Sequence, residues 1–459
     1  MKTYQDFMAA KEKGLDQTID FIQQAIQEYK SSTDYKIALD ADEYEAERNV
    51  TVMKYVKYLY DMNGQKQPDF TSANHKLASN FFHRLTTQRV AYSLGNGISF
   101  ANAQETVVDG KRIVTDTTKE ALGKDFDTVL YDASHCARNH KVSYLLWNLD
   151  HAVLFKMTEF MPLFDEIDGS LKAGFRFWSL DWDKRPVTVV VYEEDGYEKY
   201  RTKDGSKGLD LMLYEQKKAY KQDIAHNAVD PDEVVGESNY NYLPIVPLWG
   251  SRHHQSDLVG MRGKIDAYDL INSGFANDLE ECAEIYWLIG NAMGENDESL
   301  AKFRDRIKLN HIAVADLANS SVTPYTQEIP VTAKETMLNR LHAQIYEDYG
   351  ALDVHTISAD STNDHIDAAY QPMDEEADDF EYQIIKCVRG LLSIIGIDDM
   401  PLFNRNRVSN QKERTEMVML AANYLDDATV LKKLPFVTSD EVDSILMAKD
   451  QADQDMLEE

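Results

Sequence analysis

The sequence contains only three cysteines, Cys136, Cys282 and Cys387, and they are too far apart to form a CxxC pair. So few, widely spaced thiols exclude a disulfide framework and suit a reducing compartment. The sequence also lacks any run that approaches the roughly 18 consecutive apolar residues of a membrane span. We therefore expect the protein to remain in solution, without a disulfide bridge.

Basic residues are scarce relative to acidic ones. There are 48 Lys and Arg residues against 79 Asp and Glu residues, which gives a formal net charge of -31. Such a chain repels a phosphate backbone on average, so we expect no tight non-specific binding of DNA unless the basic residues are segregated, and any contact with nucleic acid should be loose. A hydrophobic fraction of 43% over 459 residues instead predicts a folded protein with about two to four lobes.

The spacing of the apolar residues changes along the chain. Helical spacing extends from about Tyr4 to Tyr60 and again from Ser72 to Leu94, where Gly95-Asn96-Gly97 ends it. Between Val153 and Tyr214 the period falls towards two, and Asp-Gly pairs separate the apolar runs. That pattern predicts antiparallel strands joined in a meander. The expected fold class is therefore α+β and mainly helical.

A long helical pattern extends from Ser256, with Ser256-Asp257 as a predicted N-cap, to Ile289. Its apolar residues step by threes and fours and form one narrow stripe. An isolated helix of this kind is not stable unless neighbouring segments cover the stripe. We therefore predict packing contacts for five stripe residues, which are Leu258, Ile265, Tyr268, Phe275 and Leu279.

Further helices are predicted towards the C-terminus. Residues Thr332 to Tyr349 have helical spacing and are followed by Gly350. An aperiodic stretch then leads into a long helix from Ile366 to Ile395, in which Pro372 is expected to cause a kink. Two more helices are expected after about Asn404.

Catalytic motifs are weak in this sequence. Gly260 to Lys264 lacks the spacing of a phosphate-binding loop, and His253-His254 with Asp257 fits either a metal site or a polar loop. The acidic runs Asp40 to Glu47 and Asp374 to Asp379 could supply paired carboxylates for a metal-dependent hydrolase or nuclease, or they could be solvated helix faces. Asp360, Asp364 and Asp367 leave the same two alternatives. No GxSxG, HExxH or Cys-His signature is present, so we predict no catalytic residue, metal or cofactor.

Three parts of the sequence together form a specific pattern. The first is LPIVPLW followed by QSDLVGMRGKIDAYDLINSGFANDLEE, and the second is Asn74 to Phe81 with Val90 to Phe100. The third is PLFNRNRVSNQKERTEMV with KKLPFV. From about Tyr35 to Asp443, the chain resembles the portal proteins of tailed bacteriophages of the long-tailed siphophage type.

The resemblance implies a portal fold and a ring of about twelve subunits, in which neighbouring chains cover the apolar stripe. It divides the chain into a wing at 1–254 (helical, with an antiparallel β part from about 150), stem helix 1 at 255–291, a small α/β clip at 292–331, stem helix 2 at 332–350, a tunnel loop at 351–365, a long wing helix at 366–403 and a short helical crown at 404–459. The loop residues implied to face the tunnel are Val354, His355, Thr356, Ile357 and Ser358.

The same resemblance implies a function without hydrolysis by the chain itself. The ring would sit at one capsid vertex of the virion, after assembly in the host cytoplasm, and double-stranded DNA would pass through it. Its implied partners are the terminase large subunit, a head-completion adaptor, and the major capsid and scaffolding proteins. A basic cluster in the clip fits contact with DNA or terminase, or an ordinary solvated or intersubunit face; it consists of Lys302, Arg304, Arg306 and Lys308.

Two other classes of protein remain as alternatives. One is the metal-dependent hydrolase already described, and the other is a coiled-coil scaffold. A coiled coil requires several sustained heptads, which the strand-forming middle of this chain interrupts.

Overall fold

The computed structural model describes most of the chain and divides it into two compact units. The described residues are 2–60, 65–70, 72–108, 111–179, 187–203, 209–225, 233–282, 286–289, 322–325, 329–354, 362–407, 411–437, 441–442 and 444–449. Unit 1 contains residues 1–48, 80–262 and 346–459, and unit 2 contains residues 49–79 and 263–345. Two long helices, α8 (Asp257–Cys282) and α10 (Val331–Tyr349), have one end in each unit.

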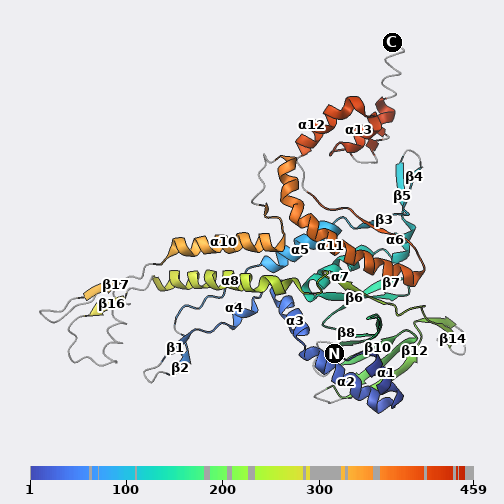
Figure 1. Cartoon of the computed structure of the whole chain (residues 1–459), viewed down its shortest axis with the longest axis horizontal. Coiled ribbons are helices and arrows are strands. Elements are labelled where there is room, and N and C mark those ends of the chain that lie inside the picture. The colour runs from blue at the N-terminus through green and yellow to red at the C-terminus, as the bar shows by residue number, and fades with distance from the viewer. Residues whose placement is uncertain are drawn as a thin grey trace, which may run out of the picture. The chain divides into compact units, whose positions relative to one another are not determined.

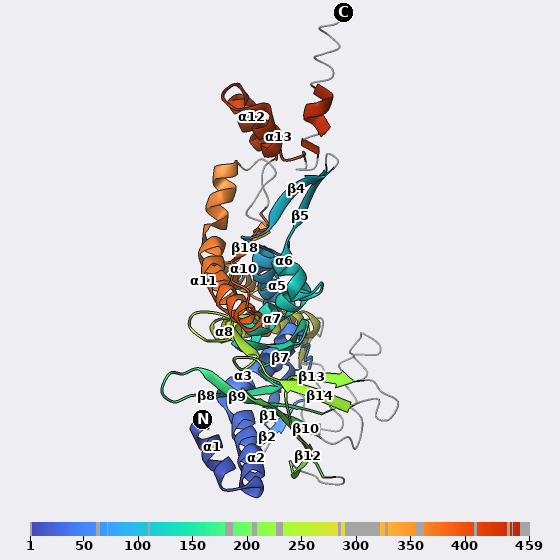
Figure 2. The same ribbon diagram turned by 90° about the vertical axis from the view of Figure 1, so that its right-hand side faces the viewer.

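The first part of unit 1 is built around a five-stranded antiparallel sheet in the order β12-β11-β10-β9-β8. This is the predicted meander, and sequence neighbours pair throughout it. Its strands are β8 (Phe160–Phe164), β9 (Leu171–Trp178), β10 (Thr188–Glu193), β11 (Gly196–Thr202) and β12 (Leu211–Lys218). Helices α1 (Tyr4–Glu12) and α2 (Leu15–Ser31) pack against the sheet through Phe7, Ile22 and Ile26 (Figures 1 and 2).

A three-stranded sheet, β15-β6-β7, forms the second core of unit 1. Its strands are β6 (Val142–Asn148), β7 (His151–Lys156) and β15 (Ile245–Trp249). Helices α7 (Phe126–His140) and α11 (Asn363–Ile395) pack on it. In α11, Gly390 permits the close approach to β15, because a Cβ at this position would lie 2.8 Å from Val246 Cγ1.

The remaining elements of unit 1 surround these cores or extend from them. They are α3 (Thr33–Glu45), α5 (Phe81–Leu94), β3 (Ile98–Phe100), β4 (Gln104–Val108), β5 (Lys111–Thr115), α6 (Thr117–Leu122), β13 (Lys221–Ala225), β14 (Glu233–Ser238), β18 (Pro401–Phe403), α12 (Gln411–Ala421), the 3-10 helix η2 (Ala422–Tyr424) and α13 (Asp427–Lys433). The predicted helix stop is confirmed, because α5 ends at Leu94 and Gly97 has a positive φ of 69°. The long helix α11 is also confirmed, with Pro372 inside it.

Unit 2 consists of the C-terminal part of α8 and the N-terminal part of α10 together with shorter elements. These are α4 (Val50–Lys54), β1 (Tyr58–Tyr60), β2 (Lys66–Pro68), β16 (Tyr286–Ile289) and β17 (Val322–Tyr325). Strand β1 pairs with β2, and β16 pairs with β17, each antiparallel. The structure corrects one sequence-based prediction here: α8 ends at Cys282, and Tyr286–Ile289 is a strand rather than the last turn of that helix.

Two other helix predictions were wrong at their ends. Residues 58–60 are not helical, because their backbone pairs with β2. The helix predicted from Ser72 begins only at Phe81. No described helix combines the length and apolar character that crossing a membrane requires.

Candidate assembly interface

The predicted stripe on α8 becomes more exposed along the helix. Leu258 and Ile265 are each only 1% exposed, and Tyr268 and Phe275 are half-buried. Leu279, near the C-terminal end, is 57% exposed. The start of the stripe is therefore buried within the chain itself, and an apolar side chain at its end is open for contact with another surface.

The start of α8 is fixed by its predicted cap. Ser256 Oγ accepts a hydrogen bond from the backbone N–H of Leu258 at 3.2 Å, and it donates one to the carbonyl oxygen of Asn139. The cap thus satisfies one of the helix's free N–H groups and attaches α8 to α7.

A second face of α8 is polar and binds the extended segment 72–79. Asp269 Oδ1 accepts from the backbone N–H of Ser79 at 3.0 Å, and Ser273 Oγ accepts from that of Leu77 at 3.0 Å. Asn277 Oδ1 accepts from the backbone N–H of His75 at 2.6 Å. The three acceptors are four residues apart on the helix, and the three donors are two residues apart on the segment.

The distance between successive acceptors on α8 matches the distance between successive donors on the segment 72–79. Four residues rise about 6 Å along a helix, and two extended residues span about 6.6 Å. One helical row of side chains can therefore satisfy alternate N–H groups of an extended chain, here in the antiparallel direction. This explains why residues 72–80 are not helical: their N–H groups bond to α8 instead of to carbonyls of their own segment. We call this arrangement the polar ladder.

Asp269 lies at one end of the polar ladder and also binds Asn49. Its side chain is fully buried, and its Oδ2 also accepts from Asn49 Nδ2 at 2.7 Å. Asn49 Oδ1 in turn caps α4 by accepting from the backbone N–H groups of Thr51 and Val52. Burial raises the pKa of Asp269, while the hydrogen bonds from Asn49 and Ser79 oppose that shift.

Helix α10 lies beside α8 in unit 2 (Figure 1). Lys334 on α10 forms an ion pair with Asp278 on α8, and its Nζ lies 5.6 Å from the centroid of the Phe275 ring. Ile345 is buried, whereas Met337 is 41% exposed. The helix pair therefore covers part of its apolar surface internally and leaves the remainder on the outside.

In unit 1, the entry of α8 and the exit of α10 meet in a buried charged cluster. Arg138 Nε donates to Asp257 Oδ2 at 2.8 Å, and Arg138 Nη1 donates to the carbonyl oxygen of Gly250 at 2.6 Å. The hydroxyl of Tyr349 also donates to Asp257 Oδ2. Arg89 lies on the Tyr349 ring, with its guanidinium carbon 3.9 Å from the centroid, and pairs with Glu376 at 3.2 Å.

Five helices contribute to this junction: α5, α7, α8, α10 and α11. Burial raises the pKa of Tyr349, and the negative charge of Asp257 adds to the shift. Burial alone would lower the pKa of Arg138, but the charges of Asp257, Tyr349 and Glu376 together outweigh that effect and raise it. Arg138 is therefore held in its charged form, and the ion pairs of Arg138 and Arg89 with Asp257 join the start of α8 to α7 and α5.

The acidic runs that could have formed a hydrolase site are paired with basic side chains. In the run at 374–379, Asp374 and Asp378 form ion pairs with Arg405, and Arg407 binds Asp374 at 2.8 Å. In the run at 40–47, Arg262 binds Asp40 at 2.7 Å. Within the described ranges, no three His, Cys, Asp or Glu side chains are grouped to hold a metal ion.

The other predicted site residues are also placed where the chain is described. The ring of His254 stacks on that of Trp249, with 3.8 Å between centroids. Val354 is 64% exposed. The remaining tunnel-loop residues, His355 to Ser358, and the basic cluster from Lys302 to Lys308 lie outside the described residues.

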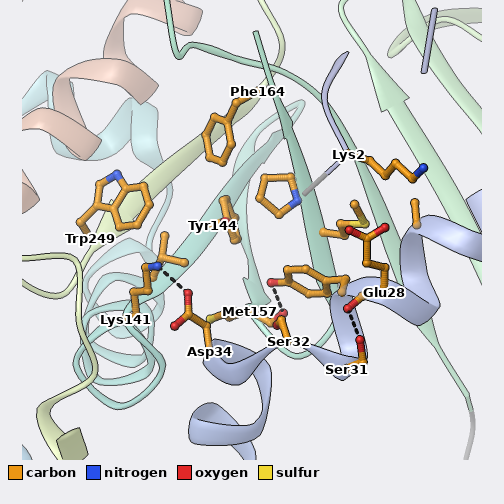
Figure 3. Close-up of a pocket in the computed structure, with 15 residues that line it drawn as sticks. Lys2, Glu28, Ser31, Ser32, Asp34, Lys141, Tyr144, Met157, Phe164 and Trp249 are labelled. Atoms are coloured by element: carbon orange, nitrogen blue, oxygen red, sulfur yellow. Dashed lines mark hydrogen bonds and ion pairs between the residues drawn. The ribbon is translucent and has the colours of Figure 1, made fainter. Parts of the chain in front are cut away.

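A cavity of about 380 Å³ lies between α2, the sheets and Trp249 (Figure 3). Apolar side chains such as Met157 and Phe164 line it, and Lys141 pairs with Asp34 at its rim at 2.7 Å. Ser31 Oγ donates to the carbonyl oxygen of Glu28 at 2.7 Å. This serine is thus bonded to a backbone carbonyl rather than to a base, which is not the arrangement of an activated nucleophile.

A buried histidine links α7 to α3. His140 Nε2 lies 2.6 Å from Asp42 Oδ1, and His140 Nδ1 lies 3.4 Å from Cys136 Sγ. Burial would lower the pKa of His140, but Cys136 and the hydrogen bond with Asp42 outweigh it and raise the pKa to about 10.

This pKa shift gives a prediction about pH. A histidine whose folded pKa exceeds its unfolded value of about 6.5 stabilises the fold fully below that value, and the contribution is lost as the pH rises through about 10. Urea denaturation between pH 6 and 10 should therefore show a falling free energy of unfolding. His140→Gln should flatten this part of the profile relative to the wild type, and an unchanged slope would contradict the assignment.

The exposed end of the α8 stripe is a surface suited to contact between protein chains. These features define the class as an assembly protein. Residues 35–455 match the family described as "Phage portal protein, SPP1 Gp6-like". The chain belongs to this phage portal protein family.

Two curated relatives, both named portal proteins, agree with the family match. The portal protein of Clostridium phage phiCD119 is 21% identical over 428 residues, covering 86% of this chain and 91% of the relative. The portal protein of Bacillus phage SPP1 is 22% identical over 423 residues, covering 83% of this chain and 77% of the relative. A solved structure described as the neck of a native GTA particle computed with C12 symmetry aligns with a TM-score of 0.39 and 8% identity, over 77% of this chain and 89% of that one.

Family membership gives the protein a phage portal role, as a component of a homo-oligomeric ring in the virion. The sequence motifs that carried the resemblance also have a structural role here. The Asp of IDAYD at position 269 and the segment containing Asn74 to Asn80 bind each other in the polar ladder. The sequence identified both segments but gave no signal that they contact one another.

Proposed function

We propose that about twelve copies of the chain form a ring at one capsid vertex, and that DNA passes through it during packaging and ejection. The observation that carries the proposal is the family match across residues 35–455. The α8 stripe supports it, because an apolar helix end that its own chain leaves exposed fits burial by a neighbouring copy.

The charge of the chain suits a conduit. A passage for DNA must not hold its cargo tightly, and a formal charge of -31 keeps phosphates away from most of the surface. We place the channel-facing loop at 351–365 and the clip at 292–331, between the stem helices 255–291 and 332–350. The wing at 1–254, the wing helix at 366–403 and the crown at 404–459 would form the outer parts.

The proposed partners follow from this position. The terminase large subunit and the head-completion adaptor would dock at the clip, where Lys302, Arg304, Arg306 and Lys308 supply positive charge for contact with DNA or terminase. The major capsid and scaffolding proteins would contact the outer parts during assembly in the host cytoplasm.

Leu279→Asp tests ring formation. Leu279 is 57% exposed, so the substitution should leave the fold of the single chain intact while placing a charge in the buried interface of the ring. Negative-stain images and native mass measurement should show single chains of 52.5 kDa instead of rings about twelve times heavier. Phe275→Asp should act in the same direction.

Ile167→Asp is the matched control, because Ile167 is 92% exposed and lies in the turn between β8 and β9. It should assemble like the wild type. Rings formed equally well by Leu279→Asp would contradict the proposed place of the stripe in the interface. A wild-type chain that stays monomeric at every concentration would contradict the ring itself.

A deletion of Thr356 to Ala359 tests the tunnel loop. The deleted residues are not part of the stripe, so rings should still form, while DNA packaging into heads should fall. The measurement is the amount of nuclease-protected DNA in an in vitro packaging reaction. Normal packaging by intact mutant rings would show that the loop lies elsewhere in the chain.

A further inference from the structure

Unit 2 carries exposed apolar and aromatic side chains around β1 and β2, in residues 55–60 and 65–70, which we call the arm. They include Tyr55, Val56, Tyr58 and Phe70, which are 49%, 40%, 47% and 89% exposed. We call these four residues the arm patch. Aromatic side chains are enriched at the centres of protein interfaces, and clustered exposed apolar groups mark contact sites.

The arm patch is held in place by ordered structure. Thr51 Oγ1 donates to Asp266 Oδ2 at 2.8 Å, which attaches the start of the arm to α8. The strands β1 and β2 pair, and the backbone N–H of Asp69 donates to the carbonyl oxygen of Lys57 at 2.9 Å. The polar ladder fixes the chain after the arm. Contacts that order a segment before it binds lower the entropy lost on binding.

A second patch of unit 2 has the properties of a partner surface. It consists of Leu279 on α8 with Val331 and Met337 on α10, which are 57%, 40% and 41% exposed. We call these three residues the stem patch. Exposed acidic side chains accompany it, namely Glu280 on α8 and Glu335 on α10.

The two patches are complementary in charge. Exposed lysines accompany the arm patch, namely Lys54 and Lys66, and Lys66 Nζ lies 3.9 Å from the centroid of the Tyr58 ring. Residues 54–70 contain three lysines and two aspartates, a net charge of +1 within a chain whose formal charge is -31, whereas the stem patch is apolar with acidic neighbours. Oppositely charged surfaces favour encounter and fix the register of a complex.

The two patches also lie on different sides of unit 2. Figure 1 draws β1 and β2 on the side of α8 away from α10, which carries most of the stem patch. Two different patches that fit one another produce a head-to-tail interface, which closes into a ring when the rotation between copies permits.

We propose that the arm patch of one copy docks on the stem patch of the neighbouring copy. The inference rests on the proposed ring function, and it adds which surfaces meet. The aromatic residues Tyr58 and Phe70 supply the apolar anchors, and the lysines of the arm face the glutamates of the stem.

Crosslinking of mixed variants tests this contact. Cys282→Ser removes the cysteine at the end of α8, while Cys136 and Cys387 are buried. In this background, Phe70→Cys and Met337→Cys are produced as separate chains that carry tags of different size. Equal amounts are assembled together and treated with a short bismaleimide. The expected result is a covalent dimer that contains both tags, whereas neither variant alone should give more than background.

The matched control replaces Phe70→Cys with Ile167→Cys, whose position is 92% exposed but outside the arm. Its mixture with Met337→Cys should remain at background. As a second measurement, Phe70→Ala with Tyr58→Ala should raise the concentration needed for ring formation about tenfold or more, with an unchanged unfolding midpoint of the single chain. The control Ile167→Ala should leave the concentration needed for ring formation unchanged.

The outcomes separate this inference from the ring itself. If rings form but the Phe70→Cys mixture crosslinks no more than its control, the docking of the arm is wrong and the ring stands. A single chain that carries both Phe70→Cys and Met337→Cys is a further test. If it crosslinks only within itself, the arm does not dock on a neighbouring copy and the ring stands. If the wild type forms no rings, both the ring and the docking are overturned.

Discussion

Replacing Arg138 with methionine is expected to lower the free energy of unfolding by about 3–5 kcal/mol. Arg138 is 2% exposed, and its loss leaves the Gly250 carbonyl without this donor and Asp257 with less positive charge. Methionine retains much of the volume, so the effect measures the lost charge and hydrogen bonds rather than a cavity. Urea denaturation followed by circular dichroism is the measurement.

Arg262→Met provides the matched control. Arg262 also forms a close ion pair, with Asp40 at 2.7 Å, but its side chain is 36% exposed. Exposed pairs contribute about 0–1 kcal/mol, because water already solvates both charges. A loss for Arg138→Met no larger than that of the control would show that the junction does not hold the ends of α8 and α10 together.

Replacing Asp269 with alanine is expected to cost about 2–4 kcal/mol, because two donors, Asn49 Nδ2 and the N–H of Ser79, would lose their acceptor at a fully buried position. Asp269→Asn should cost less, since one amide oxygen can replace one of the two carboxylate oxygens. The loss should be accompanied by faster hydrogen exchange at the amides of His75, Leu77 and Ser79.

Asp278→Ala on the same helix is the control for Asp269. Asp278 is 35% exposed and pairs with Lys334, so its loss should stay below about 1 kcal/mol and should not alter exchange in the segment 72–79. Unchanged exchange in Asp269→Ala would mean that the segment is held by contacts other than the polar ladder.

The buried carboxylate of Asp269 also has a defined dependence on pH. Burial raises its folded pKa above the unfolded value, so its contribution to stability is fully present below the unfolded pKa of about 3.9 and declines as the pH rises through the folded pKa. The hydrogen bonds that its two oxygens accept from Asn49 and Ser79 oppose this shift of the pKa.

The sequence predicted elements best where one periodicity is uninterrupted. Asp-Gly pairs between apolar runs predicted the meander from β8 to β12. Glycine predicted the end of α5 at Leu94, and helical spacing of apolar residues predicted α11. The Ser256 cap is equally local, because one side-chain oxygen acts on N–H groups two or three residues ahead.

The predictions that were wrong share one physical cause. Residues 72–80 have helical spacing, but their N–H groups find acceptors on α8, nearly two hundred residues away in the sequence. Similarly, residues 286–289 form β16 instead of the end of the predicted helix, because they pair with β17. Local propensity is weak compared with such tertiary hydrogen bonds, so a pattern in one segment could not reveal them.

By itself, the sequence determined the α+β class, the positions of the long helices and, through its motifs, the portal family. It also identified the apolar stripe of α8, whose exposed end we propose as a contact surface. Only the tertiary structure decided which acidic residues are counter-ions of Arg138, Arg405 and Lys334, and which stripe residues stay exposed. The physical reason is that burial and charge pairing depend on distances between segments far apart in the chain, and these distances exist only once the chain has folded.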